Sequence, residues 1–280
     1  MYKILSKENL NETVMRMTVE APLVAKKAQA GQFVILRADE RGERIPLTVA
    51  GYDKATGAVE IIFQIVGGAT MALARKNAGE CIPDFVGPLG NPTHVEGLKK
   101  VAVVAGGVGC AIALPVARKL HALGCEVTSI VGFRSRELVI LEKEFRAASD
   151  RFFMMTDDGS YGEQGNVCAP LNRLLESGEH FDEVITIGPL VMMKFVARAT
   201  LPYQIKTIAS MNPIMIDGTG MCGCCRLTVG GEMKFACVDG PEFDAHLINF
   251  DEAITRSRTY AAFETAARER HCNLYKKEVR

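Results

Sequence analysis

The sequence lacks an excess of charge of either sign. Its 33 Lys and Arg residues balance its 33 Asp and Glu residues, so the formal net charge at pH 7 is +0. Proteins that bind nucleic acid or an anionic membrane surface through a broad electrostatic field carry a basic excess. The composition therefore argues against nucleic acid and against a membrane as partners.

Long apolar runs are also missing. The longest, residues 101–105 and 110–117, are too short or too interrupted to span a bilayer, which takes about 20 apolar residues. Residues 1–8 contain no apolar core of the length of a secretory signal. Five cysteines are scattered and odd in number, which argues against a secreted disulfide framework: Cys81, Cys110, Cys125, Cys168 and Cys272. We therefore expect a cytoplasmic protein.

The first part of the chain, residues 1–97, is typical of a small β-barrel or sandwich. Short segments rich in β-branched residues alternate with Gly-containing turns, and the expected strands are residues 8–19, 32–38, 46–52 and 58–66. Residues 69–78 are the one helix-like piece. A Gly- and Pro-rich hinge at residues 85–92 ends the region.

Strands and helices alternate in the second part, residues 98–208. The expected strands are residues 100–105, 126–133, 152–156 and 183–187, and the expected helices are residues 111–123, 138–148, 171–178 and 190–200. This alternation predicts a parallel α/β sheet with nucleotide-binding topology. Pro115 is expected near the start of its helix, where proline is tolerated.

A third segment, residues 209–243, contains a dense group of cysteines. Cys222, Cys224 and Cys225 lie on a glycine-rich loop, and Cys237 follows a short apolar stretch. Thiolates at this density are typical of zinc or of an iron–sulfur cluster, and the residues alone leave both open. The tail, residues 244–280, is expected to contain an amphipathic helix from Phe250, either a docking element or a cap on the core.

Two glycine-rich turns are candidate anion sites, each with a plainer alternative. The turn at residues 106–109 joins a strand to a helix, so its amides and the helix N-terminus could bind a phosphate, although about half of such turns only pack tightly. The turn at residues 67–70 precedes the short helix in the same way. Arg44 could bind a pyrophosphate or be a surface charge.

Taken in chain order, these motifs resemble the ferredoxin–NADP reductase superfamily, in the branch of the dihydroorotate dehydrogenase electron-transfer subunits. They are Arg-x-Pro-Leu-Thr, Gly-Gly-Ala-Thr, Gly-Gly-Val-Gly, Ile-Gly-Pro-x-x-Met-Met-Lys and the cysteine loop. Within this branch the chain is most similar to the small subunits of NADH-dependent ferredoxin:NADP oxidoreductases, also called sulfide dehydrogenase small subunits. The resemblance implies a β-barrel FAD domain, an α/β parallel-sheet nucleotide-binding domain and a small C-terminal iron–sulfur loop, a ferredoxin reductase-like fold.

The resemblance also implies which residues bind the organic cofactors. FAD would lie on the barrel, at a flavin motif of Arg44, Pro46, Leu47 and Thr48 and a pyrophosphate turn of Gly67, Gly68, Ala69 and Thr70. The nicotinamide nucleotide, NAD(H), would lie at Gly106, Gly107, Val108 and Gly109, beside Asp157 and Gly159 and next to Gly188 and Pro189. The Cys-Gly-Pro that is usual in the family reads Ile187-Gly188-Pro189 here.

The resemblance assigns a [2Fe–2S] cluster to the cysteine loop. The pattern Cys-x4-Cys-x2-Cys followed by a distant Cys falls on Asp217, Cys222, Cys225 and Cys237. The first ligand is thus an aspartate, whose alternative role is to cap the loop. Cys224 is left over, either a free thiol or a substitute for Asp217.

The implied function is that of an electron-transfer subunit that exchanges electrons between NAD(H), FAD and the cluster, with no catalytic acid or base. Its partner would be a large flavoprotein and iron–sulfur subunit that reduces NADP and couples to ferredoxin, through flavin-based electron bifurcation. Two alternatives stay open. One is the electron-transfer subunit of an NAD-dependent dihydroorotate dehydrogenase, from which this sequence differs by having Asp217 in place of the first cysteine of the loop. The other is a nucleotide-binding regulatory module with structural zinc.

Overall fold

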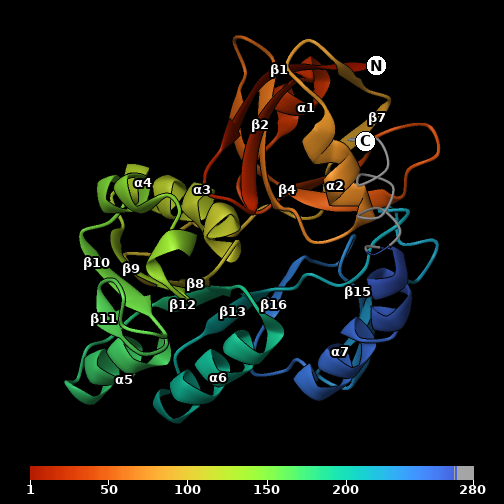
Figure 1. The fold of residues 1–280 in the computed structure, drawn as a ribbon. Coiled ribbons are helices and arrows are strands. Elements are labelled where there is room, and N and C mark those ends of the chain that lie inside the picture. The colour runs from red at the N-terminus through yellow and green to blue at the C-terminus, as the bar shows by residue number, and fades with distance from the viewer. Residues whose placement is uncertain (268, 270–280) are drawn as a thin grey trace.

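The computed structural model describes residues 1–267 and residue 269 (Figure 1). These residues form two seven-stranded sheets and a two-stranded hairpin, which lies in the chain between the last two strands of the second sheet. The first sheet lies above the second in Figure 1, and the C-terminal segment lies below the first sheet and to the right of the second.

The first sheet is antiparallel and curls into a half-barrel. Its strand order is β6-β1-β2-β5-β4-β3-β7, and two short helices join it, α1 (Pro22–Lys27) and α2 (Gly68–Arg75). Apolar side chains that alternate along the strands fill its inside, among them Met17, Ile61 and Phe85. The strand bounds are β1 Tyr2–Asn9, β2 Val14–Glu20, β3 Phe33–Arg37, β4 Arg44–Asp53, β5 Ala58–Gln64, β6 Cys81–Ile82 and β7 Asp84–Leu89.

The expectation of a single strand over residues 8–19 is wrong. The structure has a hairpin there, because the carboxamide oxygen of Asn11 accepts hydrogen bonds from the amides of Thr13 at 2.9 Å and Val14 at 2.8 Å. An Asn side chain that binds backbone amides two or three residues ahead makes a turn. The chain therefore reverses between β1 and β2.

The second sheet has the order β11-β10-β9-β8-β12-β13-β16 and is parallel except for β16. β8 is central, with β9 and β10 on one side and β12 and β13 on the other, so the strand order switches between β8 and β12. Open α/β sheets bind ligands at such a switch point. The bounds are β8 Lys100–Gly106, β9 Glu126–Phe133, β10 Arg151–Thr156, β11 Glu163–Gln164, β12 Glu183–Ile187, β13 Thr207–Ser210 and β16 Glu242–Asp244.

Helices cover both faces of this sheet. α3 (Gly109–Ala122) and α4 (Glu142–Ala147) lie on the face toward the half-barrel, and α5 (Cys168–Glu176) and α6 (Leu190–Thr200) lie on the opposite face (Figure 1). Two short 3-10 turns are Arg136–Leu138 and Leu201–Tyr203. The expectation that Pro115 lies at the start of its helix is wrong, because α3 begins at Gly109 and Pro115 lies inside it.

The C-terminal segment consists of β14 (Arg226–Val229), β15 (Glu232–Phe235) and α7 (Phe250–Ser257). The helix expected from Phe250 onward is interrupted: α7 ends at Ser257, a turn follows at residues 258–260, and residues 261–267 are helical again. The part of that expectation at residues 268 and 270–280 lies outside the described residues. One apolar core joins the segment to both sheets, through Phe33 of β3, Ala209 of β13 and Phe250 of α7. Within the described residues, no helix has the length and apolar character needed to cross a membrane.

A half-buried glutamate, Glu242, lies where the half-barrel meets the second sheet. Thr93 donates its hydroxyl hydrogen to Glu242 Oε1 at 2.6 Å, and the Thr93 amide donates to Ala30 of the half-barrel. Burial raises the pKa of Glu242 to about 7, an effect that the hydrogen bond from Thr93 opposes. The charge of Glu183 also raises this pKa and that of Lys206 lowers it.

This pKa predicts that stability falls as pH rises from about 4.5 to about 7. In that window Glu242 is ionised in the unfolded chain but protonated in the folded chain, so folding takes up a proton. Because the proton concentration falls as pH rises, the free energy of unfolding falls as well. Glutamine does not ionise, so Glu242→Gln removes this dependence of the free energy of unfolding on pH. We expect Glu242→Gln to be more stable than the wild type above pH 7, by about 3 kcal/mol at most, and no more stable near pH 4.5.

Melting temperatures measured between pH 4.5 and 8 test this expectation. The exposed Glu176 provides a matched control, since Glu176→Gln should follow the wild-type profile. Parallel profiles for Glu242→Gln and the wild type would show that Glu242 ionises normally in the folded protein.

Candidate functional site

The carboxyl ends of β8 and β12 form a tightly packed glycine junction. A Cβ atom on Gly109 would lie 2.6 Å from the Ile187 carbonyl oxygen, and one on Gly188 would lie 3.1 Å from the Gly106 amide nitrogen. Gly107 has a φ of +56° with open space beyond its Cα atom. The backbone of the loop is thus exposed at the N-terminus of α3, where a phosphate would be bound by amides and by the helix dipole.

The other residues expected near the nucleotide lie at the same edge of the sheet. Asp157 and Gly159 directly follow β10, and Pro189 precedes α6. Met192, the first methionine of the Ile-Gly-Pro-x-x-Met-Met-Lys motif, fills the space beside the junction, because its sulfur lies 2.5 Å from where a Cβ atom on Gly106 would be. The motif contributed Gly188 and Pro189 to the expected nucleotide site, and no role was expected for Met192.

Three of the four residues of the flavin motif lie on one outer face of the half-barrel, and Leu47 does not. Along β4, Ile45 and Leu47 pack against the barrel core, so the alternate residues Arg44, Pro46 and Thr48 face outward. Pro46 and Thr48 are opposite Ile35 and Phe33, which belong to the core shared with the C-terminal segment. The flavin motif therefore borders the cysteine segment.

The pyrophosphate turn begins α2. Gly67 precedes the helix, and a Cβ atom there would meet nothing within 4 Å. The Thr70 hydroxyl oxygen accepts hydrogen bonds from the amides of Val66 at 3.0 Å and Gly67 at 3.1 Å and donates to the Gly67 carbonyl at 3.0 Å. Thr70 thus holds the turn in shape, while Gly68 and Ala69 form the first turn of the helix.

The cysteine loop lies against the half-barrel. A Cβ atom on Gly218, whose φ is +86°, would lie 2.7 Å from the Cδ1 atom of Ile35 and 2.8 Å from that of Leu89. Arg44 Nε donates to the Ile216 carbonyl at 2.7 Å. Only glycine fits a left-handed backbone this close to the barrel, so the loop and the flavin motif are in direct contact.

The four thiols of the loop form two pairs. Cys225 and Cys237 are buried, with their sulfur atoms 3.3 Å apart. Burial raises the pKa of Cys237 to about 11. Cys222 and Cys224 influence each other's titration. Burial and the neighbouring Cys222 raise the pKa of Cys224, whereas amide hydrogen bonds, first that of Cys224, lower the pKa of Cys222. Two thiolates bound tetrahedrally to one metal at about 2.3 Å lie about 3.7 Å apart, so Cys225 and Cys237 are close to the spacing of ligands on one metal.

Asp217 caps its own loop. Its Oδ2 atom accepts hydrogen bonds from the Thr219 hydroxyl and from the amides of Thr219 at 3.0 Å and Met221 at 3.4 Å. These bonds, first that of the Thr219 hydroxyl, and the charge of Arg44 lower the pKa of Asp217. Among the described residues, no three His, Cys, Asp or Glu side chains converge in an arrangement that holds a metal ion, so Asp217, Cys222, Cys225 and Cys237 are not brought to one point.

The donor set nevertheless fits an iron–sulfur cluster. The backbone amides of Cys224 and Asp217 lower the pKa of Cys222, and the amide of Gly220 opposes the rise that burial causes in the pKa of Cys237. Backbone N–H groups around cysteine sulfurs tune iron–sulfur clusters. All eight cysteines among the described residues are free thiols, so each of the four in this segment is available to bind metal.

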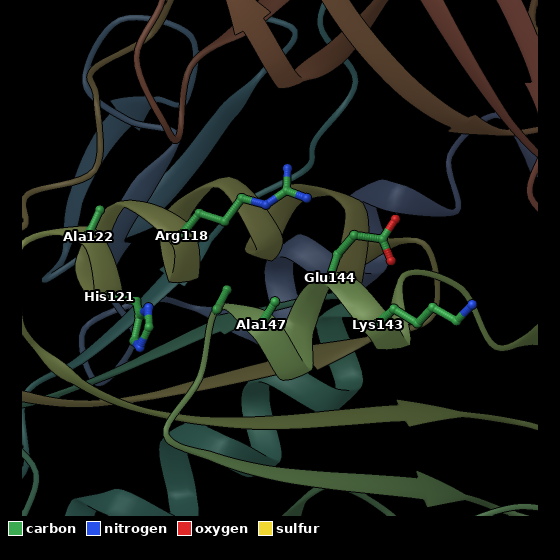
Figure 2. A pocket seen from close by; sticks show the side chains of 7 residues that line it. Arg118, His121, Ala122, Lys143, Glu144 and Ala147 are labelled. Carbon is green, nitrogen blue, oxygen red and sulfur yellow. The ribbon is translucent and has the colours of Figure 1, made fainter.

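A surface pocket elsewhere is not a second candidate. It has a volume of about 390 Å³ and lies between α3 and α4, lined by Arg118, His121, Lys143 and Glu144. Figure 2 shows Arg118 and Glu144 pointing to one side, His121 to the other and Lys143 away from all three. The charged groups do not converge on a common ligand position.

Comparison with known proteins resolves the zinc or iron–sulfur question. Residues 212–249 match the iron-sulfur cluster binding domain of dihydroorotate dehydrogenase B. The chain is also 41% identical over 268 residues to the dihydroorotate dehydrogenase B (NAD(+)) electron transfer subunit homolog of Thermotoga maritima, with 96% of this chain and 94% of the relative covered. The chain belongs to this family of electron transfer subunits.

Two further similarities cover nearly the whole chain. An uncharacterized protein encoded in the adh 3' region of Clostridium beijerinckii is 49% identical over 275 residues, which cover 95% of this chain and 93% of the relative. A chain in the structure of an NADH-dependent reduced ferredoxin-NADP oxidoreductase superposes with a TM-score of 0.92 and 38% identity, covering 97% of this chain and 98% of that one. The expected ferredoxin reductase-like fold and the resemblance to the small subunits of such oxidoreductases are confirmed.

Proposed function

We propose that this electron-transfer subunit passes electrons between NAD(H), FAD and a [2Fe–2S] cluster, within a heterodimer whose large flavoprotein and iron–sulfur subunit reduces NADP and exchanges electrons with ferredoxin. The observation that carries the proposal is the contact between the flavin motif and the cysteine loop, through Arg44 and the Ile216 carbonyl. A flavin on the outer face of β4 would border the cluster, so electrons would have a short path.

The chain's own residues would bind and orient the cofactors. Arg44, Pro46, Leu47 and Thr48 would hold the flavin, and Gly67, Gly68, Ala69 and Thr70 its pyrophosphate. The nucleotide would lie on Gly106, Gly107, Val108 and Gly109, bordered by Asp157, Gly159, Gly188 and Pro189. Asp217, Cys222, Cys225 and Cys237 would bind the cluster. Flavin converts the two-electron chemistry of a nicotinamide into the one-electron chemistry of iron–sulfur clusters, so no side-chain acid or base is needed.

The assignment of the physiological reaction rests on the nearly complete superposition with the NADH-dependent reduced ferredoxin-NADP oxidoreductase chain and on Asp217 in the first ligand position. We propose the cytoplasm as its compartment, where the free thiols of the loop stay reduced. The large subunit that co-purifies from the native host tests the reaction. If dihydroorotate reduces the flavin of that complex, the protein is instead the electron-transfer subunit of a dihydroorotate dehydrogenase.

Replacing Asp217 tests its role as a ligand. Because a carboxylate oxygen is a harder ligand than a thiolate, Asp217→Cys should keep the cluster but change its visible and EPR spectra and its potential. Asp217→Ala should lower the iron content. Thr219→Ala is a control that removes only the hydrogen bond of the hydroxyl to the carboxylate. Wild-type spectra and potential in both Asp217 variants would show that the aspartate only caps the loop.

A further inference from the structure

Three arginine side chains bind backbone carbonyl groups of the cysteine loop. Arg44 Nε donates to the Ile216 carbonyl at 2.7 Å, Arg226 Nη1 to the Gly223 carbonyl at 3.0 Å and Arg256 Nη2 to the Cys224 carbonyl at 3.3 Å. They come from three different elements: β4 of the half-barrel, β14 of the hairpin and α7. We call Arg44, Arg226 and Arg256 the arginine collar.

The collar helps to fix which way the peptide groups of the loop point; at Gly223 the carbonyl also accepts a hydrogen bond from the backbone amide of Arg226 at 3.3 Å. In a trans peptide the N–H and the C=O point in opposite directions, and the only cis peptides among the described residues are at Pro88 and Pro241. A carbonyl that is held outward by a guanidinium therefore turns the next N–H inward. Arg44 acts in this way on the amide of Asp217, and Arg226 on the amide of Cys224.

Both of these amides belong to the segment that carries the proposed ligands. Asp217 is itself the first proposed ligand, and Cys224 lies between the proposed ligands Cys222 and Cys225. Each path thus runs from a guanidinium through one peptide group to an amide of this segment, and hydrogen bonds in such a chain polarise one another. Arg256 holds the following peptide, between Cys224 and Cys225, from the side of α7.

We propose that the arginine collar positions the peptide groups of the loop with their amides toward the cluster sulfurs and thereby raises the reduction potential of the cluster. The inference rests on the proposed [2Fe–2S] site. Reduction adds a negative charge to an already anionic centre, so fixed N–H donors and nearby guanidinium groups stabilise the reduced form more than the oxidised form. It also assigns a role to α7, which packs on the segment through Phe250 and reaches the loop with Arg256.

Methionine and lysine replacements of Arg226 and Arg256 test the proposal without touching the flavin motif. Arg226→Met and Arg256→Met keep an apolar stem but lose the charge and the donors, so the midpoint potential of the cluster should fall in each and fall further in the double variant. Arg226→Lys and Arg256→Lys keep a charged donor and should recover most of the loss. Arg173, which pairs with Glu163 on the second sheet, provides the control Arg173→Met, with a wild-type potential expected.

The measurement is a redox titration of the purified holoprotein followed by EPR, with iron content determined for each variant. Lower potentials in the two methionine variants support the collar, and so does loss of the cluster from these variants alone with retention in the lysine variants. An unchanged or higher potential in Arg226→Met and Arg256→Met, with full iron content, overturns it. Absence of iron from the wild-type protein would instead contradict the proposed function and remove the basis of the collar.

Discussion

Cys237→Ala is expected to remove the iron–sulfur cluster, whereas Cys224→Ala is expected to keep it. Cys237 is buried with its sulfur 3.3 Å from that of Cys225, and Cys224 is the one thiol of the loop outside the proposed ligand set. Loss of a partner that only supports a metal ligand costs 10–100-fold in metal affinity, so loss of a ligand should lower bound iron by about tenfold or more.

Iron and sulfide analysis of anaerobically purified variants measures this difference, and melting temperature serves as the control for folding. The two substitutions are chemically identical and lie in the same segment, so a general effect of removing a thiol would affect both. If Cys224→Ala loses the cluster and Cys237→Ala retains it, the ligand set proposed here is wrong.

Gly109→Ala is expected to disrupt the nucleotide site and to destabilise the second sheet. The new Cβ atom would lie 2.6 Å from the Ile187 carbonyl oxygen and 2.8 Å from the Gly188 Cα atom. Both are backbone atoms of a buried strand end, so neither can rotate away, and α3 must move from β12. Overpacking of this kind costs about 1–3 kcal/mol, and displaced loop amides should weaken NADH binding by about tenfold, or about 1.4 kcal/mol.

Equilibrium titration with NADH and thermal unfolding measure the two effects. Gly51→Ala is the control, because a Cβ atom there meets only the side chain of Glu60 at ordinary contact distance. Wild-type NADH affinity in Gly109→Ala would show that the nucleotide does not use this loop.

Patterns that depend on neighbouring residues were sufficient to predict the two-sheet architecture. Buried strands such as residues 100–105 and the alternation with helices follow from local hydrophobicity, and the density of cysteines identified the metal segment. One of the two errors in the predicted elements has a local cause and the other a tertiary one. Asn11 makes a turn with its side chain inside an otherwise strand-like run, and the packing of α3 between the two sheets tolerates Pro115 in its interior.

Hydrogen bonds between residues far apart in the chain could not be predicted from the sequence. Arg44 bonds to a carbonyl 172 residues away, and nothing near Arg44 in the chain indicates that partner. Arg256 reaches the loop only because the core around Phe250 brings α7 to it. Of the three arginines of the collar, only Arg226 had a sequence position that indicated contact with the cysteine loop, since it directly follows Cys225. Residue type and spacing predicted the candidate ligands, but the surroundings that hold them depend on the tertiary fold.

The central claim is that electrons pass between NAD(H), a flavin and the cluster within this one chain. Anaerobic addition of NADH to the purified, cofactor-loaded protein tests it directly, with flavin absorbance and the EPR signal of the cluster followed together. We expect the flavin absorbance to bleach and a reduced [2Fe–2S] signal to appear. A colourless protein that contains zinc and no flavin, or a flavin that NADH does not reduce, would contradict it.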